Sequence, residues 1–406
     1  MQINTRTIET ENKILSYKNI LIIQDIDGVC IPLVKDPLTR KINKNYIFAV
    51  KKFDEEFFVL TCGEHEGYRG VNRIIERSLK DNIKPREEGL YLPGLAACGV
   101  EYQDNKGNIS FEGVTEKELR FLSNVPNLIK PQFRKIVENL FPRLEEAKIN
   151  LHSSKSICET KFSPTINFNS LFELAKNDLE KKKNIQKSFE RMMNEIIIYS
   201  EKEGLKDSFF LHISPNLGNV KGKEIIKYST KDDIGSTDIQ LLLKGAVKDS
   251  GVLFLLNEYI GFNTGKKPFG NNFNFRNAPF SIKEKISFCK KYIKKEDMPL
   301  IIGVGDTITS TFIDHDKSYS RGGSDRNFLE LIQLLGKSYN IENKIIFVDS
   351  SSGEVFRPST KYSGLAGITD EEDNLRFDIV FQNGPNEYIN WFFNLAERRH
   401  QIRNKN

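Results

Sequence analysis

The chain has 406 residues, of which 38% are hydrophobic and 28% are charged. A chain of this length and composition can bury a sizeable core and is expected to form about two domains. Its 60 basic residues stand against 55 acidic ones, and the formal net charge of +5 gives little reason to expect a nucleic-acid partner. A mildly basic surface could steer a phosphorylated substrate, although ordinary solvated charge is the better explanation.

Two aspartates, Asp25 and Asp27, follow the first apolar run of the chain. Such a run is typical of a buried parallel strand, and Gly28 marks the turn where the chain leaves the sheet. Ligands of open α/β sheets bind outside the carboxyl ends of the strands, so we expect both carboxylates at the edge of a crevice. One aspartate can act there as a nucleophile toward phosphorus, and the other can transfer protons. The pattern alone does not decide, because loops also use it in caps and turns.

Three further sites have a similar local context. A second apolar run ends at Thr61, and a third ends at Asp306. Between them, Lys221 lies in a Gly-flanked turn that we expect to open a helix, with Lys223 as the alternative lysine. Together with the two aspartates, these residues supply a hydroxyl, an amine and a further carboxylate. Their combination is much more specific than any one of them.

Between the threonine and lysine sites the pattern changes to charged, helix-forming segments, including an expected helix over residues 171–199. We interpret this stretch as a domain inserted into the core. The expected division is a first core part at 1–113, an inserted cap domain at 114–217 and a second core part at 218–406.

Five cysteines are widely spaced and form no Cys-x-x-Cys pair. This usage favours a reducing compartment, and we interpret Cys62, next to Thr61, as a small buried thiol. The N-terminus has no basic-then-apolar signal pattern, and the apolar run at 251–256 is far shorter than the roughly 20 residues needed to cross a bilayer. We therefore expect a cytoplasmic protein with no membrane partner.

The order Asp-x-Asp, Thr, Lys, Asp resembles the haloacid dehalogenase superfamily of phosphotransferases. The resemblance implies an α/β fold with a Rossmann-type parallel-sheet core and an inserted mixed α/β cap. It also implies that Asp25 is the nucleophile and Asp27 the acid/base, while Thr61 and Lys221 bind phosphate. Mg²⁺, which prefers hard oxygen ligands, would be held by Asp25, Asp306 and the main-chain carbonyl of Asp27.

The second metal carboxylate has no assignment. The superfamily usually carries another acid within a few residues of the position of Asp306, whereas only hydroxyl residues and one isoleucine occupy 307–311. Asp314 and Asp316 lie nearby in the sequence, and we interpret both as part of a solvated loop.

Longer stretches resemble the glucosylglycerol-phosphate phosphatase family. They are residues 25–40, 60–72, 89–97, 218–224 and 321–326. The resemblance implies release of phosphate from glucosylglycerol 3-phosphate, which yields the compatible solute glucosylglycerol used in salt acclimation. We also expect a functional association with the synthase that makes this substrate.

Four residues in or near these stretches are expected to bind the substrate: Glu64, His65 and Arg69, which follow Thr61, and Arg321. Two alternatives remain open. The first is a phosphatase for another glycosyl phosphate, such as trehalose 6-phosphate or sucrose 6-phosphate. The second is a catalytically idle protein that binds a sugar phosphate, which the intact motif residues disfavour.

Overall fold

The computed structural model describes residues 5–79, 82–220, 222–313 and 317–404. The strands of its main sheet are β1 (Ile20–Gln24), β2 (Phe57–Leu60), β3 (Gly94–Ala96), β4 (Glu101–Gln103), β5 (Ile109–Ser110), β12 (Leu300–Gly305), β15 (Lys344–Val348) and β16 (Ile379–Phe381). Their order is β16-β15-β12-β1-β2-β3-β4-β5. Strands β16 to β3 pair in parallel, and β4 and β5 are antiparallel at one edge.

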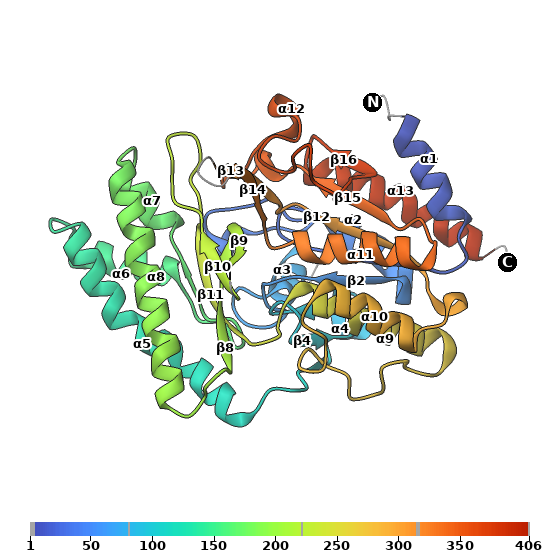
Figure 1. Cartoon of the computed structure of the whole chain (residues 1–406), viewed down its shortest axis with the longest axis horizontal. Coiled ribbons are helices and arrows are strands. Elements are labelled where there is room, and N and C mark those ends of the chain that lie inside the picture. Colours follow the sequence, from blue (N-terminus) through green and yellow to red (C-terminus); the bar gives the residue numbers. More distant parts are fainter. Residues whose placement is uncertain (1–4, 80–81, 221, 314–316, 405–406) are drawn as a thin grey trace.

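Helices cover both faces of this sheet (Figure 1). One face packs against α1 (Thr5–Ser16), α2 (Lys44–Phe53), α3 (Val71–Ser78) and α13 (Pro385–Arg403). The other packs against α9 (Lys248–Thr264), α10 (Ile282–Tyr292) and α11 (Arg326–Tyr339). Shorter elements are α4 (Pro85–Glu88), α12 (Thr360–Ser363), η1 (Pro37–Thr39), η2 (Asp54–Glu56), η3 (Lys295–Asp297) and η4 (Ser350–Ser352). The core is therefore a three-layer α/β/α arrangement.

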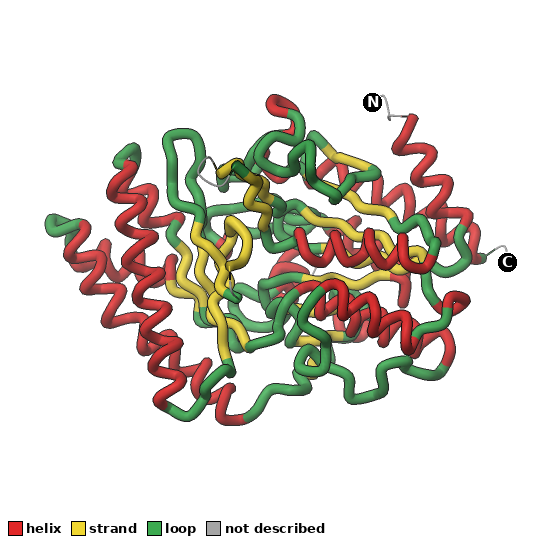
Figure 2. The backbone as a smooth tube through the Cα atoms, viewed as in Figure 1, coloured by secondary structure: helices red, strands yellow, loops and turns green. Residues whose placement is uncertain are grey.

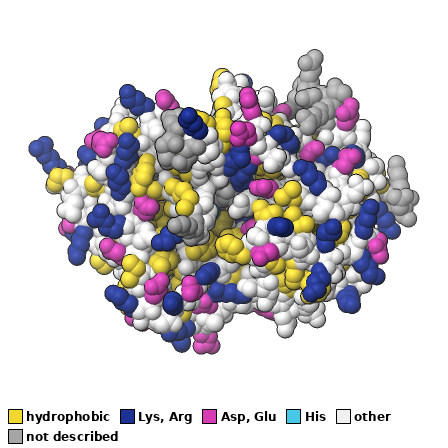
Figure 3. Space-filling model, in the orientation of Figure 1, with side chains coloured by type: hydrophobic (Ala, Val, Ile, Leu, Met, Phe, Trp, Pro, Cys, Tyr) yellow, Lys and Arg dark blue, Asp and Glu magenta, His cyan; other side chains and the backbone are white. Residues whose placement is uncertain are grey.

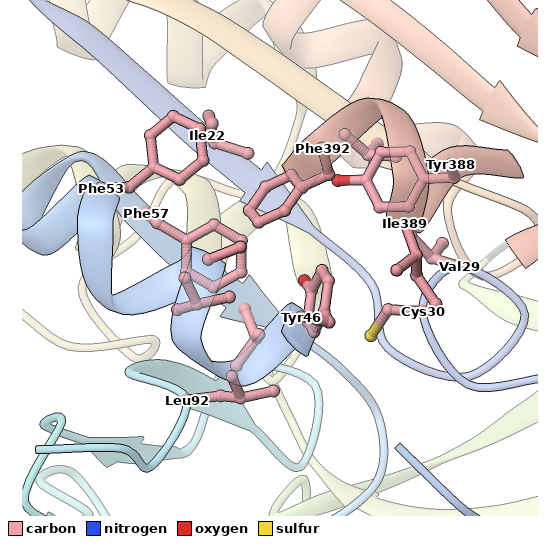
Figure 4. Packing of buried hydrophobic residues seen from close by; sticks show 14 of the residues in the cluster. Ile22, Val29, Cys30, Tyr46, Phe53, Phe57, Leu92, Tyr388, Ile389 and Phe392 are labelled. Atoms are coloured by element: carbon pink, nitrogen blue, oxygen red, sulfur yellow. The ribbon is translucent and has the colours of Figure 1, made fainter. Parts of the chain in front are cut away.

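An aromatic cluster joins the two ends of the chain within this core (Figure 4). The ring of Phe392 in α13 lies 4.9 Å from the rings of Tyr46 and Phe53 in α2, and 5.6 Å from that of Phe57 in β2, measured between centroids. Such tilted and edge-on contacts add to the stabilisation from burying the rings. The C-terminal helix thus holds the first α/β unit in place.

A second α/β unit is inserted into the core. Its sheet has the order β6-β7-β11-β8, with all pairs antiparallel. The strands are β6 (Ile157–Cys158), β7 (Thr165–Asn167), β8 (Phe209–Ser214) and β11 (Asp238–Leu243), and the helices are α5 (Glu116–Leu140), α6 (Glu146–Ser156), α7 (Asn169–Ala175) and α8 (Leu179–Lys202). Figures 1 and 2 show these helices on the side of the small sheet that faces away from the core. The expected fold class, a parallel-sheet core with an inserted mixed α/β cap, is confirmed.

Three local expectations differ from the structure. The single helix expected over 171–199 is two helices, because Lys176 has a φ of 49° and Asp178 caps α8 by accepting a hydrogen bond from Lys181 N. No helix opens after the Gly-flanked turn at 222, where β9 (Asn216–Val220) and β10 (Lys223–Ile226) form a hairpin. A second hairpin is formed by β13 (Thr309–Ile313) and β14 (Ser318–Gly322).

The expected end of the insert at residue 217 falls before β11, which pairs with both β7 and β8. We therefore propose that the insert continues through β11 and ends before α9.

The apolar run at 251–256 lies inside α9, which is buried against the main sheet. None of the described helices is long and apolar enough to cross a membrane. Basic and acidic side chains are interspersed over the face in Figure 3.

Candidate active site

The site lies at the carboxyl edge of the main sheet. Strand β1 lies between β12 and β2, so the residues that follow these three parallel strands meet at one edge. Asp25 follows β1, Thr61 follows β2 and Asp306 follows β12. A cavity of about 490 Å³ opens here, with walls from both the core and the insert, and Asp25, Asp27 and Thr61 line it. Its size suits a small-molecule ligand.

Lys248, the first residue of α9, places an amine at this site. Its Nζ lies 2.7 Å from Oδ2 of Asp25 and 2.6 Å from Oδ1 of Asp325, and all three side chains are buried. Burial lowers the pKa of Lys248, but the two carboxylates raise it above its ordinary value, so the amine stays cationic. Lys221, expected here from the sequence, lies outside the described residues.

The place of Lys248 depends on close packing of α9 against β2. A Cβ at Gly251, one turn further along the helix, would lie 2.6 Å from Cδ1 of Leu60. Glycine therefore lets the first turn of α9 approach the end of β2, next to Thr61. The signal in the sequence is a lysine three residues before the apolar run at 251–256.

Three buried carboxylates, those of Asp25, Asp306 and Asp325, have oxygens within 4.8 Å of one another. Burial raises the pKa of Asp25 to about 7, and burial with the two neighbouring acids raises that of Asp306 well above its usual range. Oδ2 of Asp306 is buried and has no hydrogen-bond partner among the described residues. A divalent cation with hard oxygen ligands fits this donor set, because it would satisfy that oxygen and relieve the repulsion.

Gly28 and Asp325 shape the carboxylate cluster. Gly28 has a φ of 85°, and a Cβ there would lie 2.1 Å from Oδ2 of Asp306. Oδ2 of Asp325 accepts hydrogen bonds from the main-chain nitrogens of Asp306 (2.9 Å) and Thr307 (3.0 Å). Asp325 is thus the acid that orients the turn after β12, and it lies 19 residues beyond Asp306 in the chain. Asp314 and Asp316 lie outside the described residues.

Asp27 is held at the cavity by Arg40, a residue that the sequence analysis missed. Nη1 of Arg40 donates to Oδ2 of Asp27 at 2.8 Å, and the Asp27 side chain is 32% exposed. Arg40 also donates to the carbonyl oxygen of Arg69. The arginine therefore orients a carboxylate that remains open to a ligand. Oγ1 of Thr61 accepts from Gly63 N at 3.2 Å and can still donate into the cavity.

Two of the four expected substrate residues, Glu64 and Arg69, line the cavity and connect the core to the insert. Oε1 of Glu64 accepts from Phe162 N at 3.1 Å. Arg69 donates from Nη2 to the carbonyl oxygen of Ser154 at 2.7 Å and from Nη1 to that of Ile157 at 3.3 Å. Both residues thus help to fix the insert over the sheet edge.

The other two, His65 and Arg321, are not among the described residues that line the cavity. His65 is fully buried, and burial lowers its pKa to about 4, so the ring is neutral. Its Nε2 lies 3.1 Å from the carbonyl oxygen of Gly94, and its Nδ1 lies 3.3 Å from Nε2 of Gln103. Arg321 donates from Nε and Nη2 to the two carboxylate oxygens of Asp370, at 2.8 and 2.6 Å. Neither side chain is brought to the substrate cavity.

Cys62 is not the free thiol expected from the sequence. It forms a disulfide with Cys98, which lies 36 residues further along the chain. The bond joins the turn after β2 to the turn after the neighbouring strand β3, and Cys98 N donates to the carbonyl oxygen of Thr61 at 3.0 Å. Such a long separation gives no local sequence signal, which is why the pairing was not predicted.

A family model described as glucosylglycerol-phosphate phosphatase matches residues 19–396. A glucosylglycerol-phosphate phosphatase of Synechocystis sp. is 40% identical over 394 residues, which cover 94% of this chain and 93% of the relative. The C-terminal domain of a C. albicans trehalose-6-phosphate phosphatase has a TM-score of 0.48 at 12% identity, over 97% of this chain and 98% of that one. The Aspergillus fumigatus trehalose-6-phosphate phosphatase gives 0.39 at 8% identity, over 95% and 97%.

Proposed function

The chain belongs to the glucosylglycerol-phosphate phosphatase family, and we propose that it hydrolyses glucosylglycerol 3-phosphate to glucosylglycerol and inorganic phosphate. The observation that carries the proposal is the cavity in which Asp25, Thr61 and the proton-transfer candidate Asp27 face the inserted domain. Because the product is a compatible solute, we further propose that the protein acts in salt tolerance. We also propose that it works in the cytoplasm and receives its substrate from the synthase that makes the phosphate ester.

Asp25 and Asp27 divide the covalent chemistry. A carboxylate oxygen of Asp25 attacks phosphorus, the bond from phosphorus to the glycerol oxygen breaks, and Asp27 donates a proton to that oxygen. In the second half, Asp27 takes a proton from a water molecule whose oxygen attacks phosphorus, and the bond from phosphorus to Asp25 breaks. Arg40 holds Asp27 in place for both transfers.

Charge at the phosphoryl group is offset by the groups around Asp25. We assign to Lys248 the role expected of Lys221, since its Nζ lies 2.7 Å from Oδ2 of Asp25. Thr61 donates a hydrogen bond to a phosphate oxygen. Positioned donors and cations of this kind supply much of the rate enhancement in phosphoryl transfer.

We propose that Asp25, Asp306 and the main-chain carbonyl of Asp27 hold Mg²⁺. The support is the unpartnered buried Oδ2 of Asp306 and the cluster of acids around it. When bound, the ion neutralises charge on the phosphoryl group and orients it toward the nucleophile. Asp325 holds the turn that carries Asp306, and its own oxygens are already engaged by Lys248 and main-chain nitrogens.

Release of phosphate from glucosylglycerol 3-phosphate in the presence of Mg²⁺ tests this function. We expect steady turnover by the natural chain, loss of turnover in excess chelator, and recovery on adding Mg²⁺. D25N, which keeps the size of the side chain but removes the nucleophile, should fold and release no phosphate. Turnover in D25N at the natural rate would contradict the mechanism, and absence of turnover in the natural chain would favour the idle binding protein.

A further inference from the structure

The small sheet of the insert presents polar side chains to the cavity. Successive side chains of a strand point to opposite faces of its sheet. In β11, Ile239 and Leu241 enter the apolar core of the insert, whereas Asp238 and Gln240 line the cavity. The face opposite the helices is therefore polar, and it is turned toward the phosphate site.

Strand register arranges this face in two rows. Asp238 lies opposite Asn167 of β7 and Ser214 of β8. Gln240 lies opposite Thr165 of β7 and His212 of β8. We call these six residues the polar rows, and all six line the cavity: Thr165, Asn167, His212, Ser214, Asp238 and Gln240. None of the six carries a permanent positive charge, so the rows suit neutral hydroxyls rather than a second phosphate.

The hydrogen bonds of the rows leave acceptors available to a ligand. Oε1 of Gln240 is buried and has no partner among the described residues. The Asp238 carboxylate accepts one bond at each oxygen, 2.7 Å from Asn167 Nδ2 and 2.7 Å from Thr237 Oγ1, and each oxygen can accept another. A buried acceptor without a donor is unfavourable, so a bound hydroxyl at Gln240 would be stabilising.

The rows lie within reach of the phosphate end of the cavity. Nε2 of His212 is 4.0 Å from Sγ of Cys62, the residue that follows Thr61. On its other side, Nδ1 of His212 lies 3.0 Å from Oε1 of Glu224, which fixes the ring. The cavity of about 490 Å³ is far larger than a phosphate group, so the space between the sheet edge and the rows must hold the rest of the ester.

We propose that the polar rows, with Asp238 and Gln240 at their centre, are the subsite for the glucosyl ring. The ring hydroxyls donate to the carboxylate of Asp238 and to Oε1 of Gln240 while the phosphate lies at Asp25. This inference rests on the proposed function, because it takes the phosphate ester of a sugar as the substrate. The subsite places sugar recognition in the insert. The main role of Glu64 and Arg69 is then to hold the insert on the core.

Two variants and a matched control test the subsite. Q240M keeps the length of the side chain but removes its hydrogen-bonding amide, and D238N removes the negative charge. Q132M makes the same change as Q240M on α5, outside the residues that line the cavity. For each protein, kcat/KM is measured for glucosylglycerol 3-phosphate and for p-nitrophenyl phosphate, and binding of glucosylglycerol is measured by calorimetry.

We expect Q240M and D238N to lose about 10-fold or more in kcat/KM for glucosylglycerol 3-phosphate, with a matching loss in affinity for glucosylglycerol. Their kcat/KM for p-nitrophenyl phosphate, which also reports correct folding, should stay within about 2-fold of the natural value, and Q132M should be unchanged. Natural kcat/KM and natural glucosylglycerol affinity in both variants would overturn the subsite, as would an equal loss on the two esters.

Failure of the proposed function has a different signature. If the natural chain releases no phosphate from glucosylglycerol 3-phosphate but binds glucosylglycerol, and Q240M weakens that binding, the function is wrong and the subsite stands. If the natural chain turns over the ester and the variants leave sugar binding unaltered, the function stands and the subsite is wrong.

Discussion

Replacing a buried lysine between two carboxylates with a neutral residue leaves the negative charge of the carboxylates buried and uncompensated. Lys248 has this position between Asp25 and Asp325. Removing one member of a buried ionic cluster typically costs about 3–5 kcal/mol, and loss of one charge-stabilising group typically lowers kcat by ~100-fold or more. For K248M we therefore expect a lower Tm and a kcat reduced by at least about 100-fold.

K221M is the matched comparison, because it makes the same change at the lysine that the sequence pattern favoured. We expect its kcat and Tm to stay close to those of the natural chain. Steady-state phosphate release and thermal unfolding measure both effects. If K221M lost turnover while K248M kept it, the assignment of Lys248 would be wrong.

Glu64 makes stability depend on pH. Burial raises its pKa from 4.5 to about 8, so the folded chain binds a proton that the unfolded chain has already released. A carboxyl group whose pKa is raised by folding makes its full contribution to the free energy of unfolding below its unfolded pKa. This contribution is lost as pH rises toward the folded pKa. We therefore expect the Tm of the natural chain to fall between pH 5 and about 8 more steeply than that of E64Q, which stays neutral.

Thermal unfolding of both proteins across this pH range measures the difference. E66Q is the control, because Glu66 is the exposed acid two residues along the same loop. Its Tm should follow the natural chain at every pH. Parallel Tm curves for E64Q and the natural chain would mean that Glu64 is not held in its neutral form.

At the residue scale, positions at strand ends could be predicted and positions set by packing could not. Asp25, Thr61 and Asp306 each follow an apolar run, and parallel strands bring such residues to one edge. Lys248 and Asp325 are placed by how α9 and α11 pack on the sheet, which no local pattern encodes. His65 follows Thr61 closely in sequence, yet it points into the core because its ring finds partners at Gly94 and Gln103.

At the scale of elements, the disulfide joins the turns after β2 and β3 and constrains both. We expect the unfolded, unreduced chain to expose three reactive thiols, those of Cys30, Cys158 and Cys289, and the reduced chain all five. Removing a disulfide typically costs about 2–4 kcal/mol, so dithiothreitol should lower the Tm of the natural chain but not that of C98S. Five reactive thiols in the unfolded chain without reductant, together with the same Tm of the natural chain with and without dithiothreitol, would show that the bond does not form.

The long apolar elements could be predicted, and their interruptions could not. The apolar runs before Asp25, Thr61 and Asp306 correspond to β1, β2 and β12, because a fully buried parallel strand needs no alternation. The helix over 171–199 is broken at Lys176, where the chain has a positive φ although no glycine or proline marks the place. The hairpin of β9 and β10 replaced an expected helix, since a glycine in a turn precedes either element.

At the scale of the whole molecule, the insert and the core form one site. Glu64 and Arg69 reach from the core to main-chain groups of the insert, and the polar rows face the sheet edge across the cavity. The sequence predicted an insert of this kind, but not that β11 belongs to its sheet. Pairing of β11 with β7 spans about seventy residues, a separation at which alternation cannot identify the partner strand.

The central claim is that this site hydrolyses glucosylglycerol 3-phosphate in preference to other glycosyl phosphates. The most direct test is kcat/KM for that ester against trehalose 6-phosphate, sucrose 6-phosphate and glycerol 3-phosphate, measured with the natural chain and Mg²⁺. A site that hydrogen-bonds particular hydroxyls discriminates strongly against analogues that leave its buried groups unpaired, so we predict a preference of at least about 100-fold. An equal or higher kcat/KM for trehalose 6-phosphate or sucrose 6-phosphate would contradict the claim.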